Sequence, residues 1–200
     1  MRHLICVMLA GLVVIIVAIG GCASKNETPQ RPVSGGTTGP ASTGSAAKID
    51  TAVDSALQKL YGTVPKSKEL AARAKGILVF PSIIKAGLLV GGQYGKGTLR
   101  EQGKTVGYYN TVAASLGLQA GAQEFGYALF FMSDPALKYL RDNDGWEIGT
   151  SPSVVILDTG AAASLTTMTA KDDVYAVFFD QKGLMAGLGL QGSKISRINP

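Results

Sequence analysis

From Gly76 to the C-terminus the chain consists of short apolar segments separated by glycine, proline and polar turn residues, and this pattern limits the fold more than any other feature. Segments of this kind are typical of β-strands. The predicted strands are 77–80, 87–94, 98–100, 105–110, 112–122, 125–132, 154–157, 174–179, 184–190 and 193–198. Pro81 is expected to end the first strand, and residues 101–104 predict a hairpin turn. Many strands with few helices predict an α+β domain with a mainly antiparallel sheet.

Two similar glycine-containing segments predict that this sheet is curved. Residues 116–121 (Leu-Gly-Leu-Gln-Ala-Gly) resemble residues 188–192 (Leu-Gly-Leu-Gln-Gly), and both alternate small with larger residues. Glycine on one strand face lets a second backbone approach closely or lets the sheet bend sharply. We therefore expect a curved sheet or barrel-like strands.

Three helices are predicted beside the strands. Residues 48–61 carry apolar residues at helical spacing, namely Ile49, Val53, Leu57 and Leu60. Pro65 breaks this helix, and Ser67 is expected to cap a second helix over 67–75. The second helix would turn Leu70, Ala71 and Ala74 inward. The third helix spans about 134–141, with an acid and a proline in its first turn. For the first two helices, core packing and membrane contact are both open.

The first residues resemble the leader of a bacterial lipoprotein. A basic tip precedes an apolar run from Leu4 to Gly21, which is typical of a secretory signal. Residues 19–22 (Ile-Gly-Gly-Cys) resemble a lipobox, so we expect a signal peptide over 1–21 and a lipid anchor on Cys22. Ordinary secretion and an uncleaved membrane anchor are the alternatives. Ser24 implies sorting to the outer membrane, with the domain facing the periplasm or the cell surface.

Residues 22–46 are expected to form the lipidated cysteine and a tether, and residues 47–200 one globular domain. The tether segment is rich in small and polar residues, with Val33 its only branched aliphatic residue. Such a composition cannot bury enough apolar surface to offset the entropy of ordering. The remaining length suits a single domain with a sizeable core.

The mature chain would contain no histidine and no free thiol. The only histidine, His3, and Cys6 lie in the expected leader, while Cys22 would be acylated. Ser-His-Asp catalysis, Cys-His catalysis, an internal disulfide and His or Cys metal sites are therefore excluded for the mature domain. We expect a domain that is not an enzyme and that uses no metal or cofactor.

Basic residues concentrate in one part of the chain. The whole chain has 19 Lys and Arg against 14 Asp and Glu. Residues 59–104 contain nine of the bases and only two acids, whereas acids outnumber bases in 105–200. The expected lipid-binding residues are Lys59, Lys66, Lys68, Arg73, Lys75 and Lys85. A basic segment beside an amphipathic helix suits an anionic membrane surface, and export makes nucleic acid an unsuitable partner. A solvated face with no partner is the alternative.

Three motifs suggest other chemistry, and each lacks a required part. The glycine-rich run 91–97 has Val90 where a phosphate loop needs glycine, and a hairpin instead of a helix follows. The run 158–160 (Asp-Thr-Gly) resembles the aspartic-protease signature, but a second aspartate would have to come from a dimer. The acids Asp142, Asp144 and Glu147 stand in a run too short for a calcium loop.

Several segments, in the same order, are similar to the SYLF family of lipid-binding modules. They are 74–81, 85–87, 91–97, 182–187 and 190–192, and the resemblance covers about residues 48–198. The resemblance implies lipid binding through an N-terminal amphipathic helix and nearby bases, without catalysis. Neither an SH3 nor a FYVE domain accompanies it here, and actin binding is not carried over.

The sequence therefore predicts an outer-membrane lipoprotein whose domain binds the surface of an anionic phospholipid membrane. The first alternative is a structural or protein-interaction module of the envelope, with a protein partner of unknown identity. The second is a dimeric aspartic protease that uses Asp158.

Overall fold

A computed structural model describes residues 41–143, 145–157, 162, 171–183, 190 and 192–200. The expected signal peptide, Cys22, Asp158 and nearly all of the strand predicted over 184–190 lie outside these residues. The described residues form three helices and six strands. These are α1 (Ala41–Thr63), α2 (Lys66–Arg73), α3 (Asp134–Asp142), β1 (Gly76–Glu101), β2 (Lys104–Phe131), β3 (Trp146–Glu147), β4 (Val154–Leu157), β5 (Val174–Gly183) and β6 (Lys194–Ile198). Among the described helices, none combines the length and the apolar character needed to cross a membrane.

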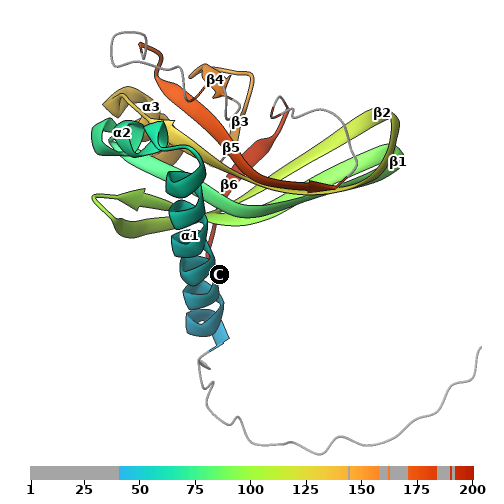
Figure 1. Cartoon of the computed structure of the whole chain (residues 1–200), viewed down its shortest axis with the longest axis horizontal. Coiled ribbons are helices and arrows are strands. Elements are labelled where there is room, and N and C mark those ends of the chain that lie inside the picture. The colour runs from blue at the N-terminus through green and yellow to red at the C-terminus, as the bar shows by residue number, and fades with distance from the viewer. Residues whose placement is uncertain (1–40, 144, 158–161, 163–170, 184–189, 191) are drawn as a thin grey trace, which may run out of the picture. The chain divides into compact units, whose positions relative to one another are not determined.

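One curled sheet contains all six strands, and its centre is β2 (Figure 1). The first part of β2 pairs with β6, its last part pairs with β5, and its other edge pairs with β1 over almost its whole length. Every pairing is antiparallel except that of β4 with β5. The predicted α+β class, the mainly antiparallel and curved sheet, and the three helices are confirmed.

The two long strands join six separately predicted segments into a single hairpin. The turn predicted at 101–104 is present, with Gln102 and Gly103 both at positive φ between the paired Glu101 and Lys104. The prediction that Pro81 ends a strand is wrong. The strand continues past Pro81 through a bulge between Phe80 and Ile83, because a bulge accommodates a residue that cannot donate to the ladder.

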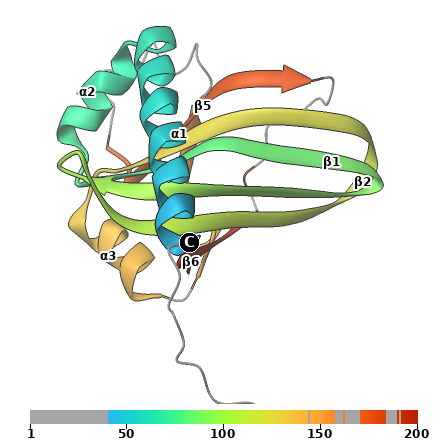
Figure 2. The same cartoon turned by 90° about the horizontal axis from the view of Figure 1, so that it is seen from below.

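β1 folds back on itself, so that its first and second halves lie side by side (Figure 2). A Cβ atom added to Gly87 would lie 2.3 Å from the Cα of Gly91, and one added to Gly97 would lie 2.0 Å from the carbonyl oxygen of Val79. Glycine permits these backbone approaches because it has no Cβ. The sequence predicted that glycines curve the sheet. The structure adds a second role for glycine, which is to let β1 double back on itself.

Apolar residues cover both faces of the sheet. The outer face packs against α1 and α2, whose buried residues are Ile49, Val53, Ala56, Leu60 and Leu70. The inner, concave face packs Phe125, Tyr127 and Phe178 with Leu137 of α3 and Trp146 of β3. The apolar stripe of α1 is thus a core element. All members of both clusters lie between Ile49 and Ile195, so we expect the compact unit 38–200 to fold by itself.

Polar contacts fix α1 to the hairpin. Arg100 donates to Asp54 at 2.9 Å and to Asp50 at 3.3 Å, and its side chain is largely buried. Asp50 also accepts hydrogen bonds from Thr105 at 2.7 Å and from Tyr108 at 2.8 Å. Burial is the main reason that the pKa of the Tyr108 hydroxyl is raised, and the hydrogen bond to Asp50 raises it further. This network joins residues about 50 positions apart in the chain.

The ends of the short helices agree only in part with prediction. α2 begins after Pro65, and Ser67 is not its cap: its hydroxyl is buried and donates to the carbonyl of Val64 at 2.5 Å. α3 begins at Asp134 as predicted, and its N-cap is Ser133, whose side chain accepts a hydrogen bond from the amide of Ala136. The amides of Ser67 and Lys68 donate to the carbonyls of Val64 and Pro65 at 2.9 and 3.1 Å, so these amides need no side-chain cap and the Ser67 hydroxyl is free to turn inward.

Candidate functional site

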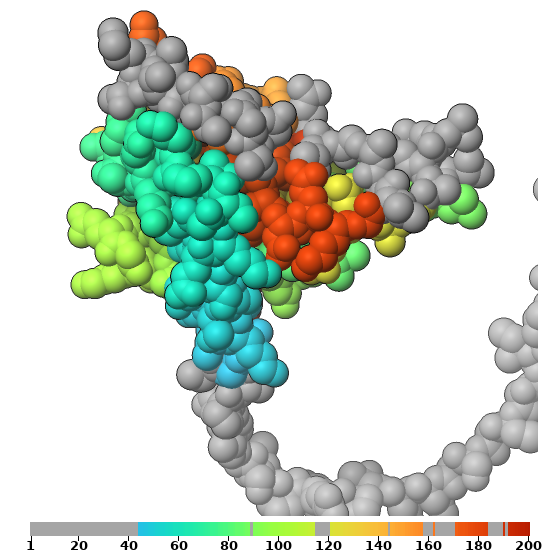
Figure 3. Space-filling model, viewed as in Figure 1, coloured from blue at the N-terminus to red at the C-terminus, as the bar shows by residue number. Residues whose placement is uncertain are grey.

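Four of the predicted bases gather on α2 and the residues that flank it. We call this set, Lys66, Lys68, Arg73 and Lys75, the basic ridge. Glu69 is the only acid in the same stretch of chain. Leu70 is buried against α1 and the sheet, which leaves the charged residues of α2 toward solvent. Figure 3 shows α2 and the last turns of α1 at the surface, close to β5.

Two of the ridge cations have acidic partners at the surface. Lys66 pairs with Glu69 at 2.8 Å and Lys75 with Asp134 at 3.5 Å. For Lys68 and Arg73, no ion pair is found within the described part of the chain. Exposed pairs contribute only about 0–1 kcal/mol, so an anionic surface could compete for Lys66 and Lys75. The ridge therefore offers two unpaired cations and two weakly paired ones.

Lys59, the next predicted base, has a different position. Its ammonium donates to Asp180 of β5 at 2.7 Å and so ties α1 to the edge of the sheet. This hydrogen bond is the main reason that the pKa of Asp180 lies below its usual value. Lys59 is thus engaged in a short contact between α1 and β5, whereas of the ridge residues only Lys75 pairs with another element, more distantly, through Asp134 of α3.

A groove of about 350 Å³ lies beside the ridge, between α1, α2 and the turn of the β1–β2 hairpin. Its apolar wall consists of Leu57, Tyr61, Ala71, Ala74 and Ile77. Lys75, Arg100 and Asp54 also line it, and because Arg100 pairs with Asp54 there, the net positive charge of the lining comes from Lys75. Burial raises the pKa of the Tyr61 hydroxyl, which therefore stays neutral. Apolar walls with a few charged groups are typical of sites that take an amphiphilic molecule.

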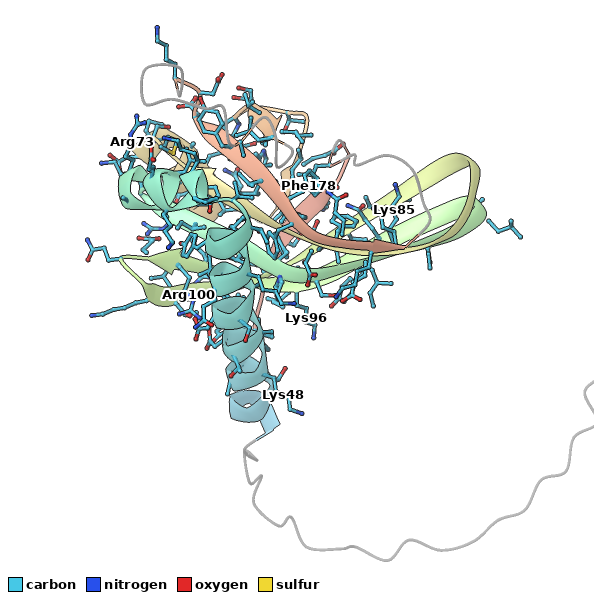
Figure 4. The ribbon with its side chains drawn as sticks, viewed as in Figure 1. Lys48, Arg73, Lys85, Lys96, Arg100 and Phe178 are labelled. Atoms are coloured by element: carbon cyan, nitrogen blue, oxygen red, sulfur yellow. The ribbon has the colours of Figure 1, made fainter. Side chains whose placement is uncertain are left out.

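Lys85, the last predicted base, does not join the ridge. Figure 4 shows Arg73 and Lys85 at different ends of the domain. Lys85 projects from the inner face of β1 and is only 9% exposed. The sequence grouped it with the surface bases because it is close to them in the chain. The structure instead separates it from them.

An exposed apolar patch is the functional feature that sequence reasoning missed. It consists of Ile84, Leu88, Val90, Tyr94 and Val112. On β1 these side chains alternate with the inward-facing Ile83, Lys85 and Gln93, so the patch lies on the outer face of the hairpin. The bulge at Pro81 sets which residues face outward, and Pro81, which is predicted to end a strand, is the only local sequence signal for it.

The three rejected motifs fall on or near described residues. The run 91–97 lies within β1 and leads into β2, so a hairpin follows it as predicted. Asp142 is exposed and pairs with Lys138 of the same helix. Within the described ranges, no three His, Cys, Asp or Glu side chains are placed to hold a metal ion.

Residues 112–199 match a family model, Ysc84, whose description is Las17-binding protein actin regulator. No curated protein matches the chain. The family match confirms the resemblance to the SYLF family over these residues and supports a lipid-binding or protein-interaction module. It begins within β2, so all six predicted bases precede the matched segment.

Proposed function

We propose that this chain, whose residues 112–199 match the Ysc84 (SYLF) family, is an envelope lipoprotein whose domain binds anionic phospholipid through the basic ridge. One observation carries the proposal. Four cations and a single acid lie on and beside a short surface helix, next to a groove with an apolar wall. Phosphate groups would contact the cations, and the glycerol and upper acyl carbons would contact Leu57, Tyr61 and Ile77.

The energies favour weak and reversible contact by the domain. A Lys or Arg near an anionic membrane surface contributes about 1 kcal/mol, and the attraction falls off within a Debye length of about 10 Å at 0.1 M salt. We further propose that acyl chains on Cys22 hold the protein at the membrane, since stable anchoring needs more than one chain. The ridge would then select anionic head groups in a bilayer that is already close. A protein that spends its time at a bilayer needs no high affinity in the domain itself.

The ridge is tested by replacing Lys66, Lys68, Arg73 and Lys75 together by glutamine in residues 38–200. Two unpaired cations contribute about 2 kcal/mol at the surface, so binding to anionic vesicles should fall about 30-fold or more. Co-sedimentation with phosphatidylglycerol vesicles across a salt series measures this, and the variant should also lose most of the salt dependence.

The matched control changes charge elsewhere on the surface. Lys171 and Lys194 are both exposed, so the pair Lys171→Gln and Lys194→Gln removes two positive charges away from the ridge. This control should bind nearly as well as the unchanged domain. Equal binding by the ridge variant and the unchanged domain would remove the ridge as the lipid site.

A protein-interaction role is the second candidate, and the exposed apolar patch favours it. Leu88 is 74% exposed on an otherwise well-packed domain. Contiguous exposed apolar residues commonly mark interaction surfaces. We expect the double substitution Leu88→Glu and Val90→Glu to abolish cross-linking of the domain to an envelope protein. Val106→Glu changes an exposed position outside the patch and should leave the cross-linking unchanged. A partner that survives the double substitution would have to bind elsewhere.

A further inference from the structure

Lys85 is the one charged side chain that is buried among the described residues. It lies directly opposite Gln123 in the pairing of β1 with β2, and Gln123 is 7% exposed. Within the described ranges, no acid and no hydrogen-bond acceptor reaches the Lys85 ammonium. The Oε1 atom of Gln123 is buried and also has no hydrogen-bond partner there. Two neighbouring buried groups thus have unused hydrogen-bonding capacity.

The fold-back of β1 brings a third polar residue to this place. Gly87 approaches Gly91, and Gly95 approaches Ser82 and Ile83. Gln93 and Lys85 lie midway between these two contacts, on adjacent halves of the strand. Gln93 is buried on the same inner face, and its Nε2 donates to the hydroxyl of Ser193 at 2.8 Å. Lys85 is therefore flanked by an amide side chain on each side.

Apolar residues lie at one end of this polar row. Ile83 precedes Lys85 by two positions on the same face of β1, and Phe125 follows Gln123 by two positions on β2. Removing an ammonium from water is costly unless an opposite charge and hydrogen bonds replace the water. One buried cation between two amides suits an oxyanion that carries a single negative charge.

We propose that the inner face holds a binding site for a singly charged oxyanion, with Lys85 as its cation and Gln93 and Gln123 as flanking amides. Two sources supply this chemistry, the carboxylate of a fatty acid and the phosphodiester of a phospholipid head group. The site does not rest on the proposed function, since it lies on the opposite face of the sheet from α1 and away from the ridge (Figure 4).

The two sources are separated by titrating residues 38–200 with laurate and with dihexanoyl phosphatidylglycerol below its micelle concentration. Isothermal titration gives Kd, and thermal unfolding gives the rise in Tm. Dihexanoyl phosphatidylcholine, which has no net charge, serves as the neutral probe. A response to laurate alone assigns a carboxylate site, and a response to phosphatidylglycerol alone assigns a phosphodiester site.

Lys85→Met should weaken binding of the active probe at least tenfold, and Gln123→Leu should weaken it several-fold. Lys96→Met is the matched control, because Lys96 is on the same strand but exposed on the opposite face (Figure 4). Without ligand, Lys85→Met should unfold at an equal or higher Tm, which separates a lost ligand contact from a damaged fold.

Three results would overturn this site. The first is that no anionic probe binds the unchanged domain. The second is that Lys85→Met and Gln123→Leu both bind as tightly as the unchanged domain. The third is that the four-residue ridge variant loses the probe while Lys85→Met keeps it, which would place the anion on the ridge. If the ridge variant loses vesicle binding but still binds the anionic probe, the result supports two separate sites, the ridge and the site at Lys85.

Discussion

Gly97→Ala is expected to destabilise the domain by about 3 kcal/mol or more, a large part of the 5–15 kcal/mol that stabilises a typical domain. The added Cβ would lie 2.0 Å from the carbonyl oxygen of Val79 and 2.8 Å from a ring carbon of Phe80. The oxygen belongs to the backbone, so it cannot rotate away as the end of a side chain could. Relief requires the two halves of β1 to separate, and that separation would disturb the inner face at Lys85 as well.

Urea denaturation of residues 38–200 measures this effect as a shift of the midpoint at unchanged slope. Gly92→Ala is the control, because the nearest atom to its added Cβ is the carbonyl oxygen of Ala113 at 3.7 Å, an ordinary contact. Its midpoint should change little. If Gly97→Ala unfolded at the same urea concentration as Gly92→Ala, the fold-back of β1 would be wrong.

Phe178→Ala should destabilise the domain by about 3–5 kcal/mol, the usual cost of removing a fully buried phenylalanine ring. Phe178 is completely buried on the inner face of β5. Its ring centre lies 5.5 Å from that of Phe125 and 5.8 Å from that of Tyr127. Since the ring of Tyr127 also packs against that of Phe80, with their centres 4.9 Å apart, these aromatic residues connect β5 to β2 and β1.

Thermal and urea unfolding of the same protein measure the loss, and Leu88→Ala is the matched comparison. Leu88 is an apolar strand residue too, but it projects from the outer face, and its removal should change stability by less than about 0.5 kcal/mol. A small effect of Phe178→Ala, similar to that of Leu88→Ala, would contradict the two-faced core. A neutral Leu88→Ala would show that this residue of the exposed patch contributes little to stability.

The positions of the predicted bases show how far a linear sequence can locate a site. The ridge residues lie within ten positions of one another, so helix geometry alone brings them to one region. Lys59 and Lys85 lie seven and ten positions outside that stretch, and one pairs with Asp180 of β5 while the other is buried on the inner face. Their surroundings depend on residues about 40 to 120 positions away.

The sequence by itself determined the features that have local causes. The amphipathic period of 48–61 predicted α1, although the helix begins seven residues earlier, at Ala41. The acid and proline at 134–135 predicted the start of α3, and Gly103 marked the hairpin turn. These signals are readable because capping, turn conformation and helical periodicity depend on neighbours only a few residues apart.

Only the tertiary structure decided how the strands combine and which way their side chains point. Six predicted segments became two continuous strands, and β1 doubled back where backbones approach across glycine. The bulge after Pro81 placed Lys85 inward and Ile84 and Leu88 outward. In a strand, a shift of one residue exchanges the two faces, so a single bulge redirects every later side chain. Pairing between distant segments, and not local preference, fixes such a shift.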